Sequence, residues 1–123
     1  MVPLVVTLDG QSFRENVDIQ SDEFYRLLAA TDSLPTTSQP SVGDFAELYR
    51  QLAASDPDIL SIHMTSGLSG TLNAAQAGAK LVPEANITFV DTKTLSAAAG
   101  WQVTAAARAA KAGWSKEQIL ALM

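Results

Sequence analysis

Residues 59–71 read ILSIHMTSGLSGT, and the fold class follows from this stretch. Its first six residues are mostly branched and apolar, which is typical of a buried strand. Residues 65–70 are small and polar, and an alanine-rich helix is predicted over residues 71–81, before Pro83 stops it. Gly78 interrupts that helix, which predicts close packing against a sheet as its reason. A strand, a short polar loop and a helix in this order form the repeating unit of an α/β fold.

The same alternation continues toward the carboxyl terminus. A buried strand is predicted over residues 87–90, and Asp91 follows it. A long alanine-rich helix then runs to about residue 112, with Gly113 well placed to end it. Ser115 and a glutamine three residues later form a capping box that begins a last helix.

Toward the amino terminus the pattern is looser. Residues 3–8 predict a strand that enters an Asp-Gly turn, and residues 12–18 predict a weaker second strand. A helix is expected to begin at Ser21. Residues 31–40 contain two prolines and five hydroxyl side chains, which predicts a loop, and Ser41 caps the next helix. We therefore expect an α/β fold of three layers, with a mostly parallel sheet flanked by helices.

Composition narrows the possible functions. The chain has 123 residues, which suits one domain, and its eight basic and thirteen acidic residues give a net charge of −5. This charge argues against nucleic-acid binding, which depends on clustered Lys and Arg. No run of about 18 apolar residues exists to span a membrane, and no signal peptide is visible. The absence of cysteine excludes thiol chemistry. The cytoplasm is the expected location.

Two segments rich in hydroxyl groups precede predicted helices. Residues 36–41 read TTSQPS and residues 65–71 read TSGLSGT. Short alcohol side chains and free backbone N–H groups at a helix N-terminus can receive an anion such as a carboxylate. Ordinary loop formation and helix capping are the more common reason for such a segment, and two of them in one sheet leave both interpretations open.

Catalytic and metal sites find less support. The glycines around Ser69 are spaced wrongly for a nucleophile elbow, and the only histidine, His63, precedes it. We interpret His63 as a strand-end or core residue with its hydrogen bonds satisfied. One histidine and no cysteine leave no typical metal site, so none is expected. Asp91 either serves a site at the strand end or caps the following helix through Thr92 or Leu95.

These loops carry a family resemblance. The run TSQPS at residues 37–41, followed by Asp44-Phe45, SGLSGT at residues 66–71 and VDT at residues 90–92, resembles the DegV family of bacterial fatty-acid-binding proteins. The resemblance implies that residues 1–123 form a single partial α/β domain, the amino-terminal one, truncated at both ends. The family's first strand would precede Met1, and its second domain would follow Met123. The apolar end of the last helix also suggests that the chain is cut.

The resemblance also implies a function. In the family a fatty acid lies between the two domains, and motif matching assigns its carboxylate contacts to Thr37 and Ser66. Full-length members present the acid to a fatty acid kinase for phospholipid synthesis; no cofactor and no catalytic residue is implied. The expected supporting loop residues are Ser38, Gly67, Ser69, Gly70 and Thr71.

Two alternatives remain open. One is a small hydrolase-like α/β enzyme that uses Ser69 as a nucleophile. The other is a truncated fragment without a function of its own, which would self-associate through exposed sheet edges as a homo-oligomer.

Overall fold

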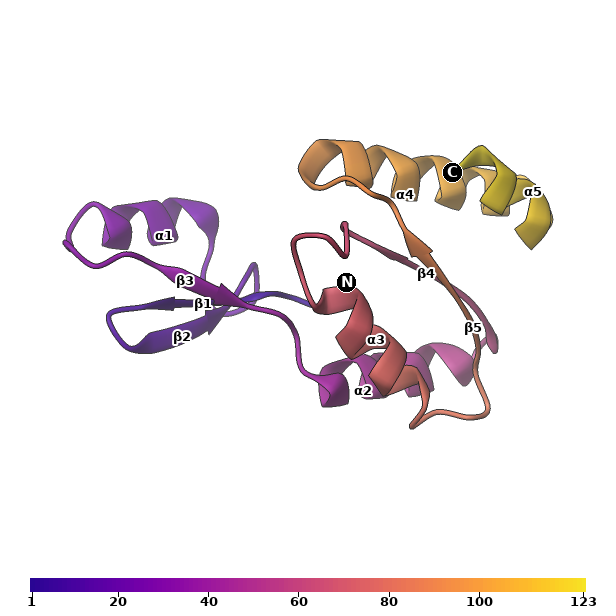
Figure 1. Cartoon of the computed structure of the whole chain (residues 1–123), viewed down its shortest axis with the longest axis horizontal. Coiled ribbons are helices and arrows are strands. Elements are labelled where there is room, and N and C mark those ends of the chain that lie inside the picture. Colours follow the sequence, from indigo (N-terminus) through magenta and orange to yellow (C-terminus); the bar gives the residue numbers. More distant parts are fainter.

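Five strands and five helices make up the protein, and the computed structural model describes all 123 residues. They fall into two parts, an α/β body and a smaller antiparallel sheet that extends from it (Figure 1). In chain order the elements are β1 (Val5–Leu8), β2 (Gln11–Arg14), α1 (Ser21–Leu28), β3 (Thr36–Ser38), α2 (Val42–Ala53), β4 (Asp58–His63), α3 (Thr71–Ala79), β5 (Asn86–Asp91), α4 (Ser96–Lys111) and α5 (Lys116–Leu122).

The body has the predicted three layers. Strands β4 and β5 pair in parallel, from Asp58 opposite Asn86 to His63 opposite Asp91. Helices α2 and α3 cover one face of this sheet, and α4 and α5 cover the other (Figure 1). Side chains alternate accordingly: Ile59 packs toward α2 and α3, while Leu60 packs toward α4 and α5. The α/β class and its flanking helices are therefore confirmed.

The larger core lies between α2, α3 and the sheet. Its buried members are Phe45, Ala46, Tyr49, Ala74, Ala75 and Val82. The close packing predicted from the small residues is confirmed, but the nearest partner of Gly78 is helix α2 and not the sheet. A Cβ atom on Gly78 would lie 2.8 Å from the Cβ of Phe45 and 2.9 Å from the carbonyl oxygen of Val42.

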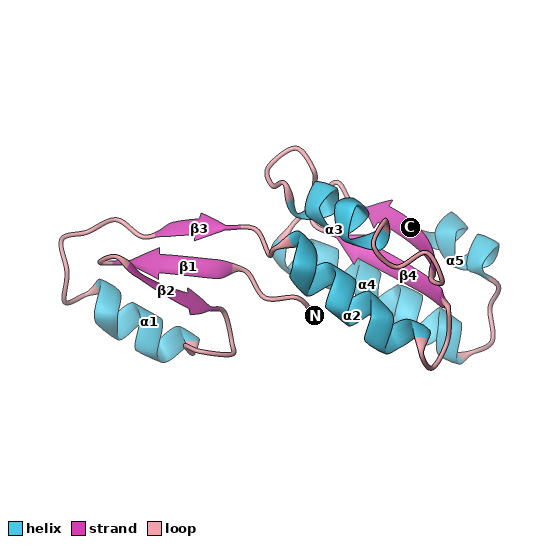
Figure 2. Ribbon diagram, turned by 90° about the horizontal axis from the view of Figure 1, so that it is seen from below, coloured by secondary structure: helices cyan, strands magenta, loops and turns pink.

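The antiparallel sheet departs from the expectation of mostly parallel strands. Its order is β2-β1-β3, and helix α1 lies beside it (Figure 2). Residues 36–38, predicted as a loop, form strand β3 because their backbone pairs with Val5–Thr7. All three β3 residues are exposed, so no hydrophobic alternation marks the strand in the sequence. The structure contains no helix with the length and apolar character needed to cross a membrane.

Candidate functional site

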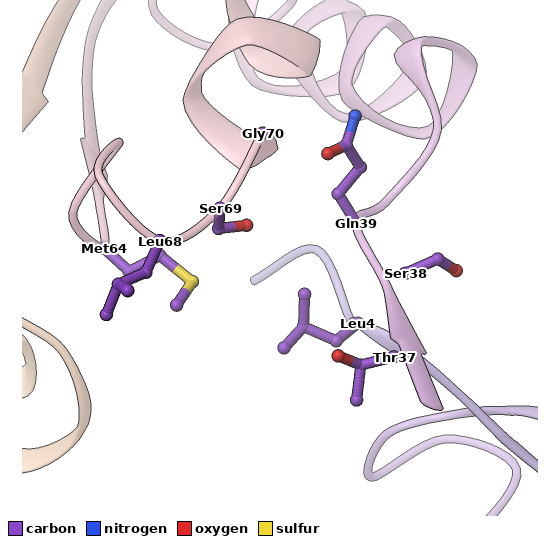
Figure 3. A pocket seen from close by; sticks show the side chains of 8 residues that line it. All are labelled: Leu4, Thr37, Ser38, Gln39, Met64, Leu68, Ser69 and Gly70. Atoms are coloured by element: carbon purple, nitrogen blue, oxygen red, sulfur yellow. The ribbon is translucent and has the colours of Figure 1, made fainter. Parts of the chain in front are cut away.

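The two hydroxyl-rich segments meet at a cavity of about 560 Å³ between the body and the antiparallel sheet. Figure 3 shows Leu4 and Thr37 on one side of it, and Met64 and Leu68 on the other. Its lining residues are Leu4, Thr37, Ser38, Gln39, Met64, Leu68, Ser69 and Gly70. Of the predicted site residues, the cavity therefore brings together Thr37, Ser38, Ser69 and Gly70. None of the eight lining residues is charged.

Strand pairing and a helix cap hold the first segment in place. Thr37 pairs with Val6 of β1, and three residues later Pro40 is fully buried. Ser41 forms the predicted capping box of α2: its Oγ accepts from the backbone N–H of Asp44 at 3.1 Å, and the Asp44 carboxylate accepts from the Ser41 N–H at 3.0 Å. The segment is thereby anchored at both ends while its hydroxyl groups stay exposed.

The two segments make contact at Gly70. The side chain of Gln39 lies against Gly70, and a Cβ atom on that glycine would approach Gln39 Cδ to 2.8 Å (Figure 3). Sequence reasoning gave Gln39 no role, and no local pattern reveals this long-range contact. It also did not identify Leu4, Met64 and Leu68 as the apolar wall, although an exposed leucine in a glycine-serine loop is a usable signal.

The second segment folds around its own hydroxyl groups. Thr65 Oγ1 accepts from the Gly67 N–H at 3.2 Å, and Ser69 Oγ accepts from the Thr71 N–H at 3.2 Å. Ser69 Oγ also lies 2.7 Å from Thr71 Oγ1. Gly67 and Thr71 thus support the loop without lining the cavity. Some of the hydroxyl groups of this segment therefore serve loop formation, whereas no side chain caps helix α3.

Ser66 turns toward strand β5 and does not line the cavity. Its hydroxyl donates to Asp91 Oδ2 at 2.5 Å, and its backbone N–H donates to the same oxygen at 3.3 Å. Lys93 adds its ammonium group to that oxygen at 2.8 Å and its backbone N–H to Oδ1 at 3.0 Å. Hydrogen bonds from Lys93 and then Ser66 hold the pKa of Asp91 far below its usual range.

Asp91 therefore does not cap helix α4. Leu95 occupies the N-cap position of that helix, which has no side-chain cap. The parallel register explains the actual role of Asp91, because it ends β5 directly opposite His63, where the loop containing Ser66 begins. The sequence predicts that Asp91 ends a strand, but it does not predict that Asp91 contacts Ser66.

His63 is a buried residue with satisfied hydrogen bonds, as predicted. Its Nε2 lies 2.8 Å from Ser61 Oγ, which in turn lies 2.7 Å from the Tyr49 hydroxyl. The rings of Phe45 and Phe89 stand 5.7 and 6.2 Å from its own. Burial lowers the pKa of His63, so the imidazole is neutral at pH 7. No three His, Asp or Glu side chains gather in the structure as a metal site would require.

A second, smaller cavity of about 240 Å³ lies between α1 and the antiparallel sheet. Val6, Ile19 and Phe24 contribute apolar surface to it, and Thr37 lines it as well. Thr37 therefore borders both cavities. The apolar surface of the smaller cavity lies on the other side of Thr37 from the hydroxyl groups of the larger one.

Comparison with known proteins gives the site a context. The chain is 48% identical over 120 residues to the DegV domain-containing protein YejH of Lactococcus lactis. It superposes with a TM-score of 0.91 on DegV of Bacillus subtilis, described as a fatty acid binding protein, at 34% identity and 97% coverage of this chain. A DegV family protein of Thermus thermophilus, whose structure concerns fatty acid binding, gives a TM-score of 0.88 at 37% identity and 98% coverage of this chain.

This chain covers only part of each of these proteins. The matches cover 97–98% of this chain, but only 42% of the length of YejH and of the Thermus protein and 43% of the Bacillus protein. The sequence profile of the family described as "Uncharacterised protein, DegV family" matches residues 1–123, and the chain therefore belongs to the DegV family.

Proposed function

We propose that this chain binds a long-chain fatty acid, with the acid group at the junction of the two hydroxyl-rich segments and the acyl chain along the apolar wall. The observation that carries the proposal is the cavity itself, which combines the hydroxyl groups of Thr37 and Ser69 with apolar side chains such as Leu68. Such a combination suits an amphipathic ligand with a small polar head. The fatty-acid-binding Bacillus and Thermus proteins, similar over nearly all of this chain, support the same ligand class.

The head-group contacts of the proposal are Thr37 and Ser66. Thr37 supports it through its place in the cavity wall. Ser66 enters the proposal through the family resemblance alone, because in the structure its hydroxyl donates to Asp91 and it does not line the cavity. Ser38, Gly67, Ser69, Gly70 and Thr71 shape the surrounding loops.

Ligand retention by variants tests this assignment. A buried hydrogen bond to a charged group contributes about 1.5–3 kcal/mol, so we expect Thr37→Ala with Ser66→Ala to weaken binding of a fluorescent fatty acid by about 100-fold or more. Thr36→Ala is the matched control, because Thr36 neighbours Thr37 on the same exposed strand but does not line the cavity. Unchanged retention by the double variant would refute the head-group assignment. Native mass spectrometry of the purified chain identifies any fatty acid that co-purifies.

The proposal is one of binding and not of catalysis. Ser69 Oγ is paired with Thr71, and the imidazole of His63 is engaged with Ser61, so the hydrolase alternative has no base at its nucleophile. Stoichiometric labelling of Ser69 by a serine-reactive probe would contradict this part of the proposal.

The proposal has three further elements. The family resemblance supports presentation of the bound acid to a fatty acid kinase for phospholipid synthesis, in the cytoplasm. The unpaired outer edges of β4 and β5 support self-association of the isolated chain. Because the chain spans about 42% of its relatives, we expect the isolated chain to bind weakly. A monomer in size-exclusion chromatography would contradict the expected self-association. A nanomolar affinity of that monomer for a fatty acid would contradict the expected weak binding.

A further inference from the structure

A chain of hydrogen bonds joins helix α2 to strand β4. The Tyr49 hydroxyl lies 2.7 Å from Ser61 Oγ, and Ser61 Oγ lies 2.8 Å from His63 Nε2. Tyr49 is 2% exposed and His63 is 8% exposed, so both end groups of the chain lie inside the protein. None of the three residues lines the larger or the smaller cavity. Their role is therefore not direct contact with a ligand in those cavities.

The direction of this chain follows from its protons. The Tyr49 hydroxyl makes no other hydrogen bond, and a buried O–H left without an acceptor costs its full desolvation. Tyr49 therefore donates to Ser61, and the single proton of Ser61 is directed to Nε2 of His63. A neutral imidazole carries one N–H, so Nε2 is the acceptor nitrogen and the proton is on Nδ1.

Protonation of His63 is incompatible with this direction. With a proton on Nε2, the imidazolium and the Ser61 hydroxyl would each point a proton at the other. Ser61 can accept from Nε2–H only by turning its own proton toward Tyr49, whose hydroxyl proton then has no acceptor in the core. The chain thus has one satisfied direction, and that direction exists only while His63 is neutral.

Burial decides when His63 becomes charged. The titratable groups that face it are Tyr49 on α2 and Asp91, which lies opposite it on β5. Burial raises the pKa of Tyr49, so its hydroxyl keeps its proton. Asp91 favours the charged imidazole, but burial has the larger effect and lowers the pKa of His63. The other close neighbours are the uncharged rings of Phe45 and Phe89. His63 is therefore charged only in acid, below a pH of about 6.5.

The same chain connects the two walls of the larger cavity. Strand β4 leads into Met64 on one wall, and helix α2 begins at the cap of Ser41, directly after the segment with Gln39 on the other. The end of β4 is fixed to β5, because the His63 carbonyl oxygen accepts from the backbone N–H and the hydroxyl of Thr92 at 3.0 and 2.9 Å. Helix α2 has no such backbone pairing, so side-chain contacts hold it on the strand.

We infer that the Tyr49–Ser61–His63 chain is a pH-sensitive tie, which holds α2 against β4 at neutral pH and so keeps the larger cavity in its ligand-binding shape. This inference rests on the proposed function and adds a regulation to the same site. At neutral pH every proton of the tie has an acceptor. In acid the tie leaves a buried donor unpaired, α2 separates from the strand, and the bound acid is released.

The first test needs no ligand. His63 is the only histidine of the chain, so the ¹⁵N resonances of labelled histidine belong to one side chain. At pH 7.5 we expect a protonated Nδ1 and an unprotonated Nε2. A proton on Nε2 at that pH would overturn the direction of the tie and with it the inference.

Retention of a fluorescent fatty acid by the whole chain from pH 7.5 to 5 is the second readout. Titration of the ligand's own carboxyl group is common to all variants, so their differences report the tie. Tyr49→Phe lacks the tie at every pH, whereas His63→Gln offers an acceptor oxygen to Ser61 at every pH. We expect the wild-type affinity to match His63→Gln at pH 7.5 and to fall toward Tyr49→Phe in acid. The gap to His63→Gln should widen by at most about tenfold per pH unit, because one proton is taken up.

A second tyrosine supplies the matched control. Tyr25→Phe removes a hydroxyl from a residue on α1 that is 65% exposed, and its pH profile should follow the wild type. A wild-type profile parallel to that of His63→Gln over the whole range would overturn the inference alone. If the wild-type chain retains no fatty acid at pH 7.5, the proposed function fails and its regulation with it. Circular dichroism establishes folding at each pH, and the NMR measurement on the wild type decides by itself should Tyr49→Phe not fold.

Discussion

Replacement of Gly78 by alanine tests the packing of helix α3 on helix α2. The added Cβ would lie 2.8 Å from Phe45 Cβ, 2.9 Å from the Val42 carbonyl oxygen and 3.1 Å from the Ala46 backbone nitrogen. Two of these atoms belong to the backbone of α2 and the third is fixed directly to it. No side-chain rotation can relieve the contact, so the two helices must separate.

The magnitude follows from two opposing effects. Alanine gains about 1 kcal/mol over glycine from helix propensity. Overpacking of a well-packed core costs up to about 3 kcal/mol, and a contact with backbone belongs at the upper end. The expected net destabilisation is therefore about 2 kcal/mol, or a fall in Tm of about 8 °C at roughly 4 °C per kcal/mol for a chain of this size.

Thermal and urea unfolding followed by circular dichroism measure this effect. Gly100→Ala is the matched control, because Gly100 lies within the exposed face of α4 and its Cβ would meet nothing within 4 Å. That variant keeps only the propensity gain and should be stabilised by up to about 1 kcal/mol. A Gly78→Ala chain as stable as the wild type would show that the helices do not pack as closely as described.

Two further predictions concern the site and the buried histidine. Gly70→Ala should leave Tm nearly unchanged, because the added methyl meets the flexible end of Gln39 and Gly70 has an ordinary φ of −75°. The variant should nevertheless weaken retention of a fluorescent fatty acid, because the methyl moves the Gln39 side chain. Unchanged retention would exclude a role for Gln39 in shaping the cavity. His63 has a lowered pKa in the folded state, so the unfolded state binds the proton more readily, and its contribution to stability should be lost as pH falls from about 6.5 toward the folded pKa. Urea unfolding from pH 7.5 to 5 should show this loss, and His63→Gln should show less of it.

The layers of the body were predictable because burial of a strand on both faces produces a run of apolar residues in the sequence. Ile59 and Leu60 face opposite helical layers, and the resulting apolar run identifies β4 without any tertiary information. The capping box at Ser41 was equally readable, since its two partners lie three residues apart. Such patterns predict structure because the interactions behind them join residues that are close together in the sequence.

Strand β3 and the partner of Ser66 were not predictable for the opposite reason. Residues 36–38 are exposed and become a strand only by pairing with β1, about thirty residues earlier. Ser66 meets Asp91, twenty-five residues later, only because β4 and β5 pair in a particular parallel register. Neither interaction leaves a periodic trace in the sequence.

Different parts of the fold position the two hydroxyl-rich segments of the site. The segment containing Thr37 is positioned by the antiparallel sheet and the cap of α2, whereas the loop containing Ser66 is positioned by the parallel pair and by Asp91. The cavity therefore depends on two separately stabilised units, joined where Gln39 lies against Gly70. Because that contact involves one flexible side chain, a change there alters the cavity with little effect on either unit. Stability and ligand affinity should thus respond to different glycines of the same region, Gly78 for the first and Gly70 for the second.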